Sequence, residues 1–311
     1  MKTVAIIIPV FNNDESIKLF YDRLKIVINS IKDYNFIICF IDDGSKDKSS
    51  EIIKKLIHND KRVKLVILTR NFGKEAALSA GLDHVQADAV IPIDVDLQDP
   101  PELIKKMISI WSTGVPLVLA RRISRKDDTI FKRFSADIFY YIHNKLSTTQ
   151  IPKNVGEFRL MDKSVVDSVK LLPEKVRFMK GIFAWVGYDF HIIDFARPKR
   201  SSGETGFNAL QLFKLAKDGL FSFSLAPLKL SSIFGYLGAL SSLLYGLYIL
   251  FRTLFYGVDA AGFPSLMVAI LFIGSLNLIF IGILGEYIGR IYIESKNRPI
   301  YLIKNIVETD V

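Results

Sequence analysis

The chain has 311 residues, half of them apolar, and its mean hydropathy of +0.28 is high for a soluble protein. Its net charge of +9 fits anionic lipid or a phosphorylated ligand better than nucleic acid, because the sequence has no basic cluster interleaved with aromatic residues and no zinc-finger spacing. The single cysteine, Cys39, excludes an intramolecular disulfide bond.

The first 120 residues alternate between apolar, β-branched segments and helical patterns. The predicted strands are Val4–Val10, Phe36–Ile41, Val63–Leu68, Ala89–Ile93 and Val115–Leu119. The predicted helices are Glu15–Ile31, Ser49–Ile57, Lys74–Val85 and Pro101–Trp111. Continuous apolar strands that alternate with helices predict a parallel sheet covered on both faces. We therefore expect a doubly wound α/β domain, with Asp99 as the N-cap of the fourth helix.

Two aromatic-rich amphipathic stretches follow, Phe131–Leu146 and Ala209–Phe223. Such stretches can be ordinary helices that face a core, or helices that lie in a membrane interface. The apolar sequence that comes next favours the interface. We assign 1–206 to the α/β domain and 207–229 to an interfacial segment.

Residues 230–289 have the composition of a transmembrane hairpin. Ser231–Tyr256 has one charged residue and Phe263–Leu284 has none, and each segment is long enough to cross a bilayer. Charge is uneven around the pair, because the loop 257–262 has no Lys or Arg whereas both flanks do. The positive-inside rule therefore places both termini, including a C-terminal tail over 290–311, in the cytoplasm. Two buried helices of a soluble protein are the alternative.

Polar residues follow four of the predicted strands. They are Asn12, the run Asp42–Ser45, the run Thr69–Lys74, and the pair Asp94 and Asp96. Ligands of an open parallel sheet bind outside the carboxyl ends of its strands, so these turns predict one site. The sequence has no P-loop and no dinucleotide fingerprint. Two carboxylates two residues apart can instead share Mg²⁺ or Mn²⁺, which would neutralise a diphosphate.

Six longer motifs resemble those of a known protein family. They are IIIPVFN (Ile6–Asn12), IDDGS (Ile41–Ser45), RNFGKEAALSAG (Arg70–Gly81), IDVDLQDPPE (Ile93–Glu102), NVGEFRLMD (Asn154–Asp162) and RFMKGIFAWVG (Arg177–Gly187). The chain resembles family 2 glycosyltransferases of the GT-A fold, in the polyprenyl-phosphate branch. Within that branch it is similar to bactoprenol glucosyltransferases and, more distantly, to dolichol-phosphate mannose synthases.

The resemblance implies a set of site residues. Those expected to bind the nucleotide-sugar donor are Pro9, Phe11, Asp42, Lys74, Asp94, Val95, Arg122 and Arg200. Asp96 and Gln98 are expected to hold the metal. Those expected to act in catalysis are Asp94, Asp96, Glu157 and Arg122.

The resemblance also implies the reaction, an inverting transfer of a hexose to a polyprenyl phosphate at the cytoplasmic face of a bacterial inner membrane. Glucose from UDP-glucose is the first expectation, and N-acetylhexosamine, mannose and a modified pentose stay open. The acceptor phosphate is already largely ionised at neutral pH, so it hardly needs a general base. We expect Glu157 to position the sugar or Arg159. Two phosphate groups must approach each other, and we expect this to be made possible by the basic residues Arg121, Arg122, Arg125 and Arg200.

Three departures from the family pattern stand out. Asn13 stands where the family often has Glu, Glu157 replaces the usual Asp, and Gly206 replaces a usual Lys that binds phosphate.

Two other functions share part of this pattern. A processive polysaccharide synthase usually has a Gln-x-x-Arg-Trp motif and more membrane helices, which this chain lacks. A catalytically inactive membrane scaffold is disfavoured by the intact Asp94, Asp96, Gln98 and Arg122.

Small residues recur at four-residue spacing in the first apolar helix. One row is Ser231, Gly235 and Ala239, and a second is Gly238, Ser242 and Gly246. Small residues at this spacing let helix backbones approach closely in a membrane. One row can face the second helix of the hairpin and the other another subunit, so we expect a homo-oligomer. The resemblance points to a tetramer.

Overall fold

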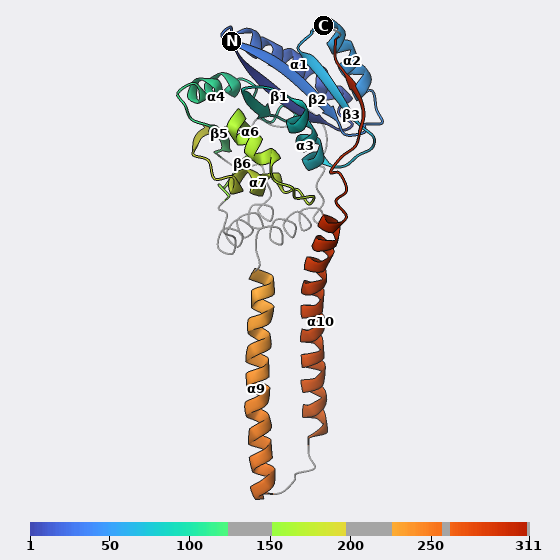
Figure 1. Ribbon diagram of the computed structural model, residues 1–311, viewed down its shortest axis with the longest axis vertical. Coiled ribbons are helices and arrows are strands. Elements are labelled where there is room, and N and C mark those ends of the chain that lie inside the picture. Colours follow the sequence, from blue (N-terminus) through green and yellow to red (C-terminus); the bar gives the residue numbers. More distant parts are fainter. Residues whose placement is uncertain (124–150, 197–225, 257–261, 310–311) are drawn as a thin grey trace.

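The computed structural model describes residues 1–123, 151–196, 226–256 and 262–309 (Figure 1). The two predicted amphipathic stretches, Phe131–Leu146 and Ala209–Phe223, lie outside the described residues. Arg125 and Arg200 lie outside them as well. The described part contains a mixed α/β domain, above, and two long helices that extend from it.

The strands are β1 (Lys2–Val10), β2 (Tyr34–Asp42), β3 (Val63–Leu68), β4 (Ala89–Pro92), β5 (Leu117–Arg122), β6 (Val155–Asp162), β7 (Phe190–Phe195) and β8 (Ile303–Val307). The helices are α1 (Asp14–Asn29), α2 (Ser49–Asn59), α3 (Lys74–His84), α4 (Leu103–Trp111), α6 (Lys163–Lys170), α7 (Met179–Trp185), α9 (Ala226–Tyr256) and α10 (Phe263–Ser295). The five predicted strands and four predicted helices of the first 120 residues are all present, and no end differs by more than three residues.

All described strands form one sheet in the order β7-β5-β6-β4-β1-β2-β3-β8. β1 to β4 are parallel to one another, and β5 pairs with β7 in parallel. Two strands run the other way. β6 is antiparallel between β4 and β5, and β8 is antiparallel to β3 at the edge. The α/β class is therefore confirmed, but the sheet is mixed rather than parallel.

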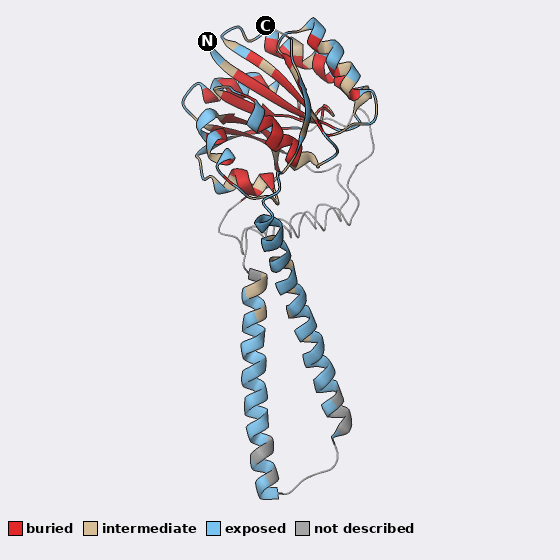
Figure 2. Cartoon of the chain, turned by 45° about the vertical axis from the view of Figure 1, so that its right-hand side comes forward, coloured by how far each residue is buried: buried red, intermediate tan, exposed pale blue. Residues whose placement is uncertain are grey.

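The sheet has a core on each face because successive side chains of a buried strand point in opposite directions. On β1, Ile6 and Ile8 belong to the core under α1, α2 and α4. Ala5 and Ile7 belong to the core under α3, α6 and α7. Figure 2 shows the buried residues gathered on the sheet and on the helix faces turned toward it. Gly81 has no side chain, which lets α3 pack close to β1. A Cβ at this position would lie 2.3 Å from Ile7 Cγ2.

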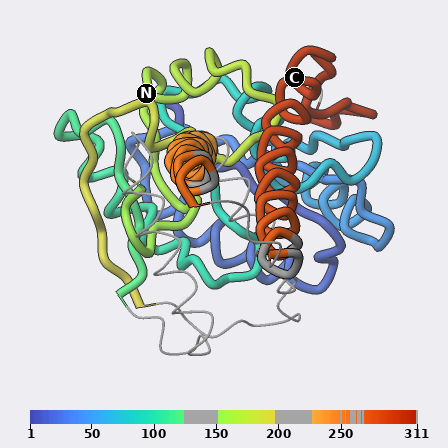
Figure 3. The backbone as a smooth tube through the Cα atoms, turned by 90° about the horizontal axis from the view of Figure 1, so that it is seen from below, coloured from blue at the N-terminus to red at the C-terminus, as the bar shows by residue number. Residues whose placement is uncertain are grey.

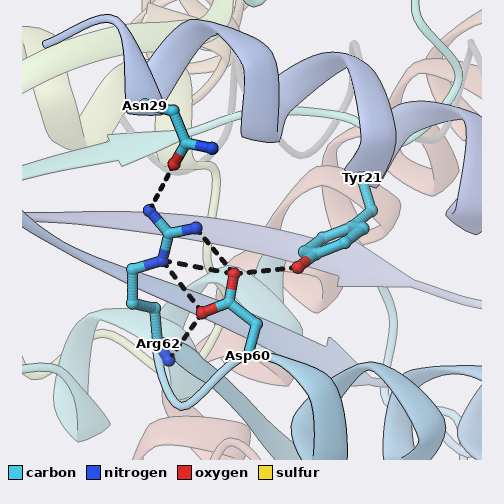
Figure 4. A network of polar contacts seen from close by, with 4 residues as sticks. All are labelled: Tyr21, Asn29, Asp60 and Arg62. Carbon is cyan, nitrogen blue, oxygen red and sulfur yellow. Dashed lines mark hydrogen bonds and ion pairs between the residues drawn. The ribbon is translucent and has the colours of Figure 1, made fainter.

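A polar network at the far end of the sheet ties α1 to the turn between α2 and β3 (Figure 4). Asp60 Oδ2 accepts hydrogen bonds from Tyr21 Oη at 2.8 Å and from Arg62 Nη2 at 2.7 Å. Arg62 Nη1 donates to Asn29 Oδ1 at 2.9 Å. Burial opposes ionisation of Asp60, but these donors outweigh it and hold the pKa of the carboxyl at about 2.

Helix α4 begins later than expected. A turn bonds Leu103 N to Pro100 O at 3.1 Å, and the helix starts at Leu103. Asp99 is therefore not its N-cap, so that prediction is wrong. The Asp99 side chain is buried and lies 4.0 Å from Arg122 Nη2 instead. Its burial beside an arginine places it in the candidate site rather than at a helix end.

The C-terminal third forms an antiparallel helical hairpin (Figure 1). Within the described residues, Pro227–Tyr248 and Val268–Ser295 are apolar and long enough to cross a membrane. The chain beyond α10 is not only a tail, because β8 returns to the domain and pairs with β3. The sequence of β8 is one short apolar segment, and nothing in it indicates that β3 is its partner.

Candidate active site

The turns after β1, β2, β3 and β4 meet at one edge of the sheet. In the parallel register, Val10 lies beside Asp42, and Asp42 lies beside Ile67. The carboxyl ends of neighbouring strands therefore coincide, which is where ligands of such sheets bind. The structure confirms that the polar strand ends converge.

Asp43 anchors the loop between β3 and α3. Its Oδ1 accepts the N–H of Phe72 at 2.7 Å, and its Oδ2 accepts the N–H of Gly73 at 2.9 Å. Gly44 lies against the same loop, with φ at +72°, and a Cβ there would be 2.5 Å from the carbonyl carbon of Arg70. The β2 turn thus holds the β3 loop, which places the next residue, Lys74.

Asp42 shapes the turn beside the end of β1. It is buried and accepts hydrogen bonds from Ser45 N at 2.8 Å and from Ser50 Oγ. Pro9 lies at the end of β1, and Phe11 follows the strand with 42% of its surface exposed. The three residues expected to contact the nucleoside are therefore neighbours, and the ring of Phe11 is open to a ligand.

Lys74, the first residue of α3, lies between two acidic side chains from distant parts of the sequence. Its Nζ is 2.7 Å from Asp94 Oδ1 and 2.5 Å from Glu157 Oε2. Burial opposes its charge, but the two carboxylates raise the pKa of Lys74 above the ordinary value. Lys74 therefore joins the loop after β4 to the antiparallel strand β6.

Two further charged residues surround this ion pair. Burial favours a neutral Glu157, but Lys74 and Lys180 outweigh it and lower the pKa of its carboxyl to about 2. Glu75 follows Lys74 on α3 and accepts a hydrogen bond from Met179 N at 3.2 Å. Burial and the nearby Glu157 charge raise the pKa of Glu75 to about 7. The cluster thus contains one glutamate that is ionised and one that holds its proton more strongly than an ordinary glutamate.

The candidate metal ligands lie in the loop after β4. Asp96 Oδ1 accepts the N–H of Gln98 at 3.1 Å, and Leu97 between them has a φ of +60°. Asp94, Asp96 and Gln98 offer only oxygen ligands, which suit Mg²⁺ or Mn²⁺. Among the described residues, no group of three or more His, Cys, Asp or Glu side chains is arranged to hold a metal alone. Mg²⁺ usually completes such a set with substrate phosphates and water.

The predicted arginines are distributed unevenly. Arg122 lies at the end of β5 near Asp99 and, like the metal loop, borders the strand-end site. Arg121 points elsewhere, since its guanidinium pairs with Asp194 of β7 at 2.7 Å on the exposed surface. Its expected part in phosphate binding is not supported by this geometry. Arg125 and Arg200 lie outside the described residues.

A cavity of about 430 Å³ adjoins the cluster. Val155 and Arg159 line it, and Glu157 lies between them on the same face of β6. Lys180 and Phe183 of α7 form another wall, with the guanidinium of Arg159 4.1 Å from the Phe183 ring centre. Glu157 therefore lies between the strand-end site and an open cavity with cationic and aromatic walls.

Sequence reasoning missed Asp43, Glu75 and Lys180 as parts of the site. In the sequence, Asp43 is one of several polar residues at a strand end, and Glu75 resembles an ordinary acidic residue in the first turn of a helix. The one available signal was their place inside the quoted motifs.

Comparison with known proteins identifies the family. Residues 5–170 match the family model of glycosyl transferase family 2. The chain belongs to this family. It is therefore a glycosyltransferase, and the predicted GT-A type of α/β fold is confirmed.

Curated relatives match nearly the whole chain. The chain is 49% identical over 302 residues to a bactoprenol glucosyl transferase of Shigella phage SfV, covering 97% of this chain and 98% of the relative. It is 46% identical over 303 residues to a prophage bactoprenol glucosyl transferase homolog of Escherichia coli K12, covering 97% and 99%. Among solved structures, glucosyl-3-phosphoglycerate synthase from Mycobacterium tuberculosis with Mn²⁺, UDP-glucose and phosphoglyceric acid matches at 17% identity and a TM-score of 0.46, covering 70% of this chain and 76% of that one.

The raised pKa of Glu75 predicts a pH-dependent effect of Glu75→Gln on stability. The folded protein keeps this proton up to about pH 7, whereas an unfolded chain loses it near pH 4.5, so stability falls as the pH rises through this window. The variant lacks this loss. Its melting temperature relative to wild type should therefore rise between pH 5 and pH 8, by about 3 °C or more.

Thermal unfolding in mild detergent at both pH values measures the difference. Glu51→Gln, on the exposed side of α2, is the control and should show the same offset at both pH values. An offset for Glu75→Gln that does not change with pH would show that Glu75 is ionised in the folded protein.

Proposed function

We propose that the protein moves glucose from UDP-glucose to undecaprenyl phosphate, or to a similar polyprenyl phosphate, with inversion at the anomeric carbon. The observation that carries the proposal is the match along nearly the whole chain to relatives named bactoprenol glucosyl transferase. At 97% coverage, this match includes both the strand-end site and the apolar hairpin. A site with the same lipid acceptor but another nucleotide sugar is the second candidate.

The donor nucleotide is assigned to the strand ends. The exposed ring of Phe11 offers a face on which a base can stack, beside Pro9 and the turn fixed by Asp42. Val95 and Asp94, after β4, are assigned to the ribose and diphosphate. This placement follows the general position of ligands in open α/β sheets.

Asp96 and Gln98 are assigned to the metal, which would be Mg²⁺ or Mn²⁺. When bound, such an ion neutralises the diphosphate and stabilises the charge of the departing nucleotide. Lys74 and Arg122 provide protein charge on two sides of the same space, and Arg200 is assigned to the phosphates as well.

The acceptor requires cations more than it requires a base. A phosphomonoester has a second pKa of about 6 and is already largely ionised at pH 7. The pKa of Glu157 is lowered to about 2, so this carboxylate is a weak base. Its contact with Lys74 supports a role in positioning that lysine and the sugar. An inactive scaffold is disfavoured, because a partly buried cluster of charges without a ligand to bind is costly to keep.

The first test compares wild type with Asp96→Ala in membranes that contain undecaprenyl phosphate and Mg²⁺ or Mn²⁺. Wild type should transfer glucose from UDP-glucose, and the variant should lose about 100-fold or more of kcat, because a metal ion is worth several kcal/mol in the transition state. Near-normal turnover by the variant at saturating metal would remove Asp96 from the metal site.

Asp22→Ala, on the exposed side of α1, is the matched control and should keep full activity. A panel with UDP-N-acetylhexosamine, GDP-mannose and a nucleotide-linked modified pentose separates the candidate donors. Transfer of another sugar in preference to glucose would overturn the donor but keep the lipid acceptor. Failure of every donor would favour the inactive scaffold.

We also propose that the hairpin spans a bacterial inner membrane with the domain and both termini in the cytoplasm. Support comes from the charges. Lys229 lies in the first turn of α9, Arg290 lies in the last two turns of α10, and Lys296 and Arg298 follow α10. The described side chains of both candidate spans are largely exposed to their surroundings, as lipid-facing residues are. This orientation places the strand-end site on the cytoplasmic side of the membrane.

Cysteine labelling of whole cells checks this topology. A Cys in place of Asp259 should react with a membrane-impermeant thiol reagent, and a Cys in place of Lys304 should not. The native Cys39 is buried and gives no background. The reverse labelling pattern would contradict the proposed orientation.

We further propose that α9 mediates a homo-oligomer, with a tetramer as the expected size. Support comes from the glycines in its two rows of small residues. In the described part of the chain, a Cβ at Gly235, Gly238 or Gly246 would meet no atom outside its own helix within 4 Å. Figure 3, seen from below, shows α9 and α10 as two separate columns. The glycines of both rows are therefore open to another subunit.

Replacing Gly235 and Gly238 together with Leu should lower the oligomer size in mild detergent, because the added side chains keep helix backbones apart. Light scattering measures the size of the assembly. Gly274 and Gly282 of α10, replaced together with Leu, provide the control. A wild-type protein that is monomeric and fully active would contradict the proposal.

A further inference from the structure

The upper end of α10 contacts the loop that leads into α7. α10 has 33 residues, about 50 Å at 1.5 Å per residue, which exceeds the roughly 30 Å of a bilayer core. Its last turns can therefore extend beyond the lipid to the underside of the domain (Figure 1). There Glu294 Oε1 accepts the N–H groups of Lys175 and Val176, at 2.8 and 3.4 Å.

The segment after α10 makes a second contact, with the other side of the same site. Leu302 O accepts the N–H of Thr69, the residue after β3, at 2.9 Å. Tyr301 Oη donates to Asp83 Oδ2 of α3 at 2.8 Å. β8 then pairs with β3 along its length. The chain that leaves the hairpin is thus bonded to the strand and helix on either side of the 69–73 loop.

Both contacts involve segments that end next to Lys74. On one side, Thr69 begins the loop whose Phe72 and Gly73 amides are held by Asp43, directly before Lys74. On the other side, the loop 173–178 ends at Met179, whose N–H donates to Glu75, directly after Lys74. The end of α10 therefore connects to both neighbours of the lysine that bridges Asp94 and Glu157.

Two charged side chains of the loop 173–178 keep a polar atom without a hydrogen bond. Among the described residues, Glu174 Oε2 and Arg177 Nε are buried without a hydrogen-bond partner. Arg177 Nη2 donates within the same region, to Leu172 O at 2.8 Å. Glu294 is the group from outside this loop that binds two of its backbone N–H groups. A charged acceptor makes stronger hydrogen bonds than a neutral one, so Glu294 is well suited to fix the loop.

We propose that Glu294 is a positioning residue through which the hairpin holds the loop 173–178, the start of α7 and thereby Lys74 in their working arrangement. The effect on turnover rests on the proposed function, whereas the effect on the loop does not. Small displacements of aligned groups reduce turnover strongly, because alignment of the reacting groups provides much of the rate.

The experiment uses the full chain in lipid nanodiscs with undecaprenyl phosphate and the donor sugar that wild type accepts. Glu294→Ala should lower kcat about 10- to 100-fold and change the KM for the donor less than about threefold. Glu294→Gln keeps an oxygen that accepts both N–H groups, so it should recover most of kcat. Glu308→Ala, which removes a surface pair between the residue after β8 and Lys64 of β3, is the matched control and should keep wild-type kcat.

Hydrogen exchange gives a readout that needs no activity. Glu294→Ala should exchange faster than wild type at the amides of 175–179, and Glu308→Ala should not. Unchanged exchange at these amides would overturn the proposal even if the donor were misassigned. A wild-type kcat for Glu294→Ala, or equal losses for the Ala and Gln variants, would overturn it too. If wild type transfers no sugar while exchange responds as expected, the proposed function fails and the positioning contact stands.

Discussion

The site depends on one interaction, the double ion pair that Lys74 makes with Asp94 and Glu157. Three carboxylates, including Glu75, lie around this lysine in a partly buried region, where like charges repel strongly. Removing one partner of such a partly buried ion pair costs more stability than the pair itself contributes, because the remaining charge is left without an opposite charge. The sheet topology makes the interaction available, since the antiparallel β6 lies directly between β4 and β5 and brings Glu157 beside the β4 turn.

Much of the fold and part of the site could be predicted from local patterns. Continuous apolar strands identified β1 to β4, and the polar residues after them identified the strand-end site, because both signals lie within a few residues. The pair Asp94 and Asp96 was recognisable as a metal candidate for the same reason. These features need no knowledge of which strands are neighbours.

The remainder depends on contacts between distant segments. Nothing local to residues 155–162 indicates that β6 enters the sheet against the direction of its neighbours, and nothing in 303–307 indicates β3 as a partner. Asp99 resembles a helix cap because Pro100 and Pro101 suit a first turn, whereas its burial beside Arg122 follows from the approach of β5. Glu75 is an ordinary first-turn acid in sequence, and only the packing of α7 on α3 gives it a buried partner.

The position of β8 in the chain has a consequence for biogenesis. A ribosome completes residues 303–307 only after both helices of the hairpin have been made, so the hydrogen-bonding edge of β3 stays open until then. An open edge strand readily pairs with strands of other molecules. Insertion of the hairpin during translation would hold the nascent domain at the bilayer surface while the edge of β3 is still unpaired. β8 can then close this edge of the sheet only after the hairpin has been made.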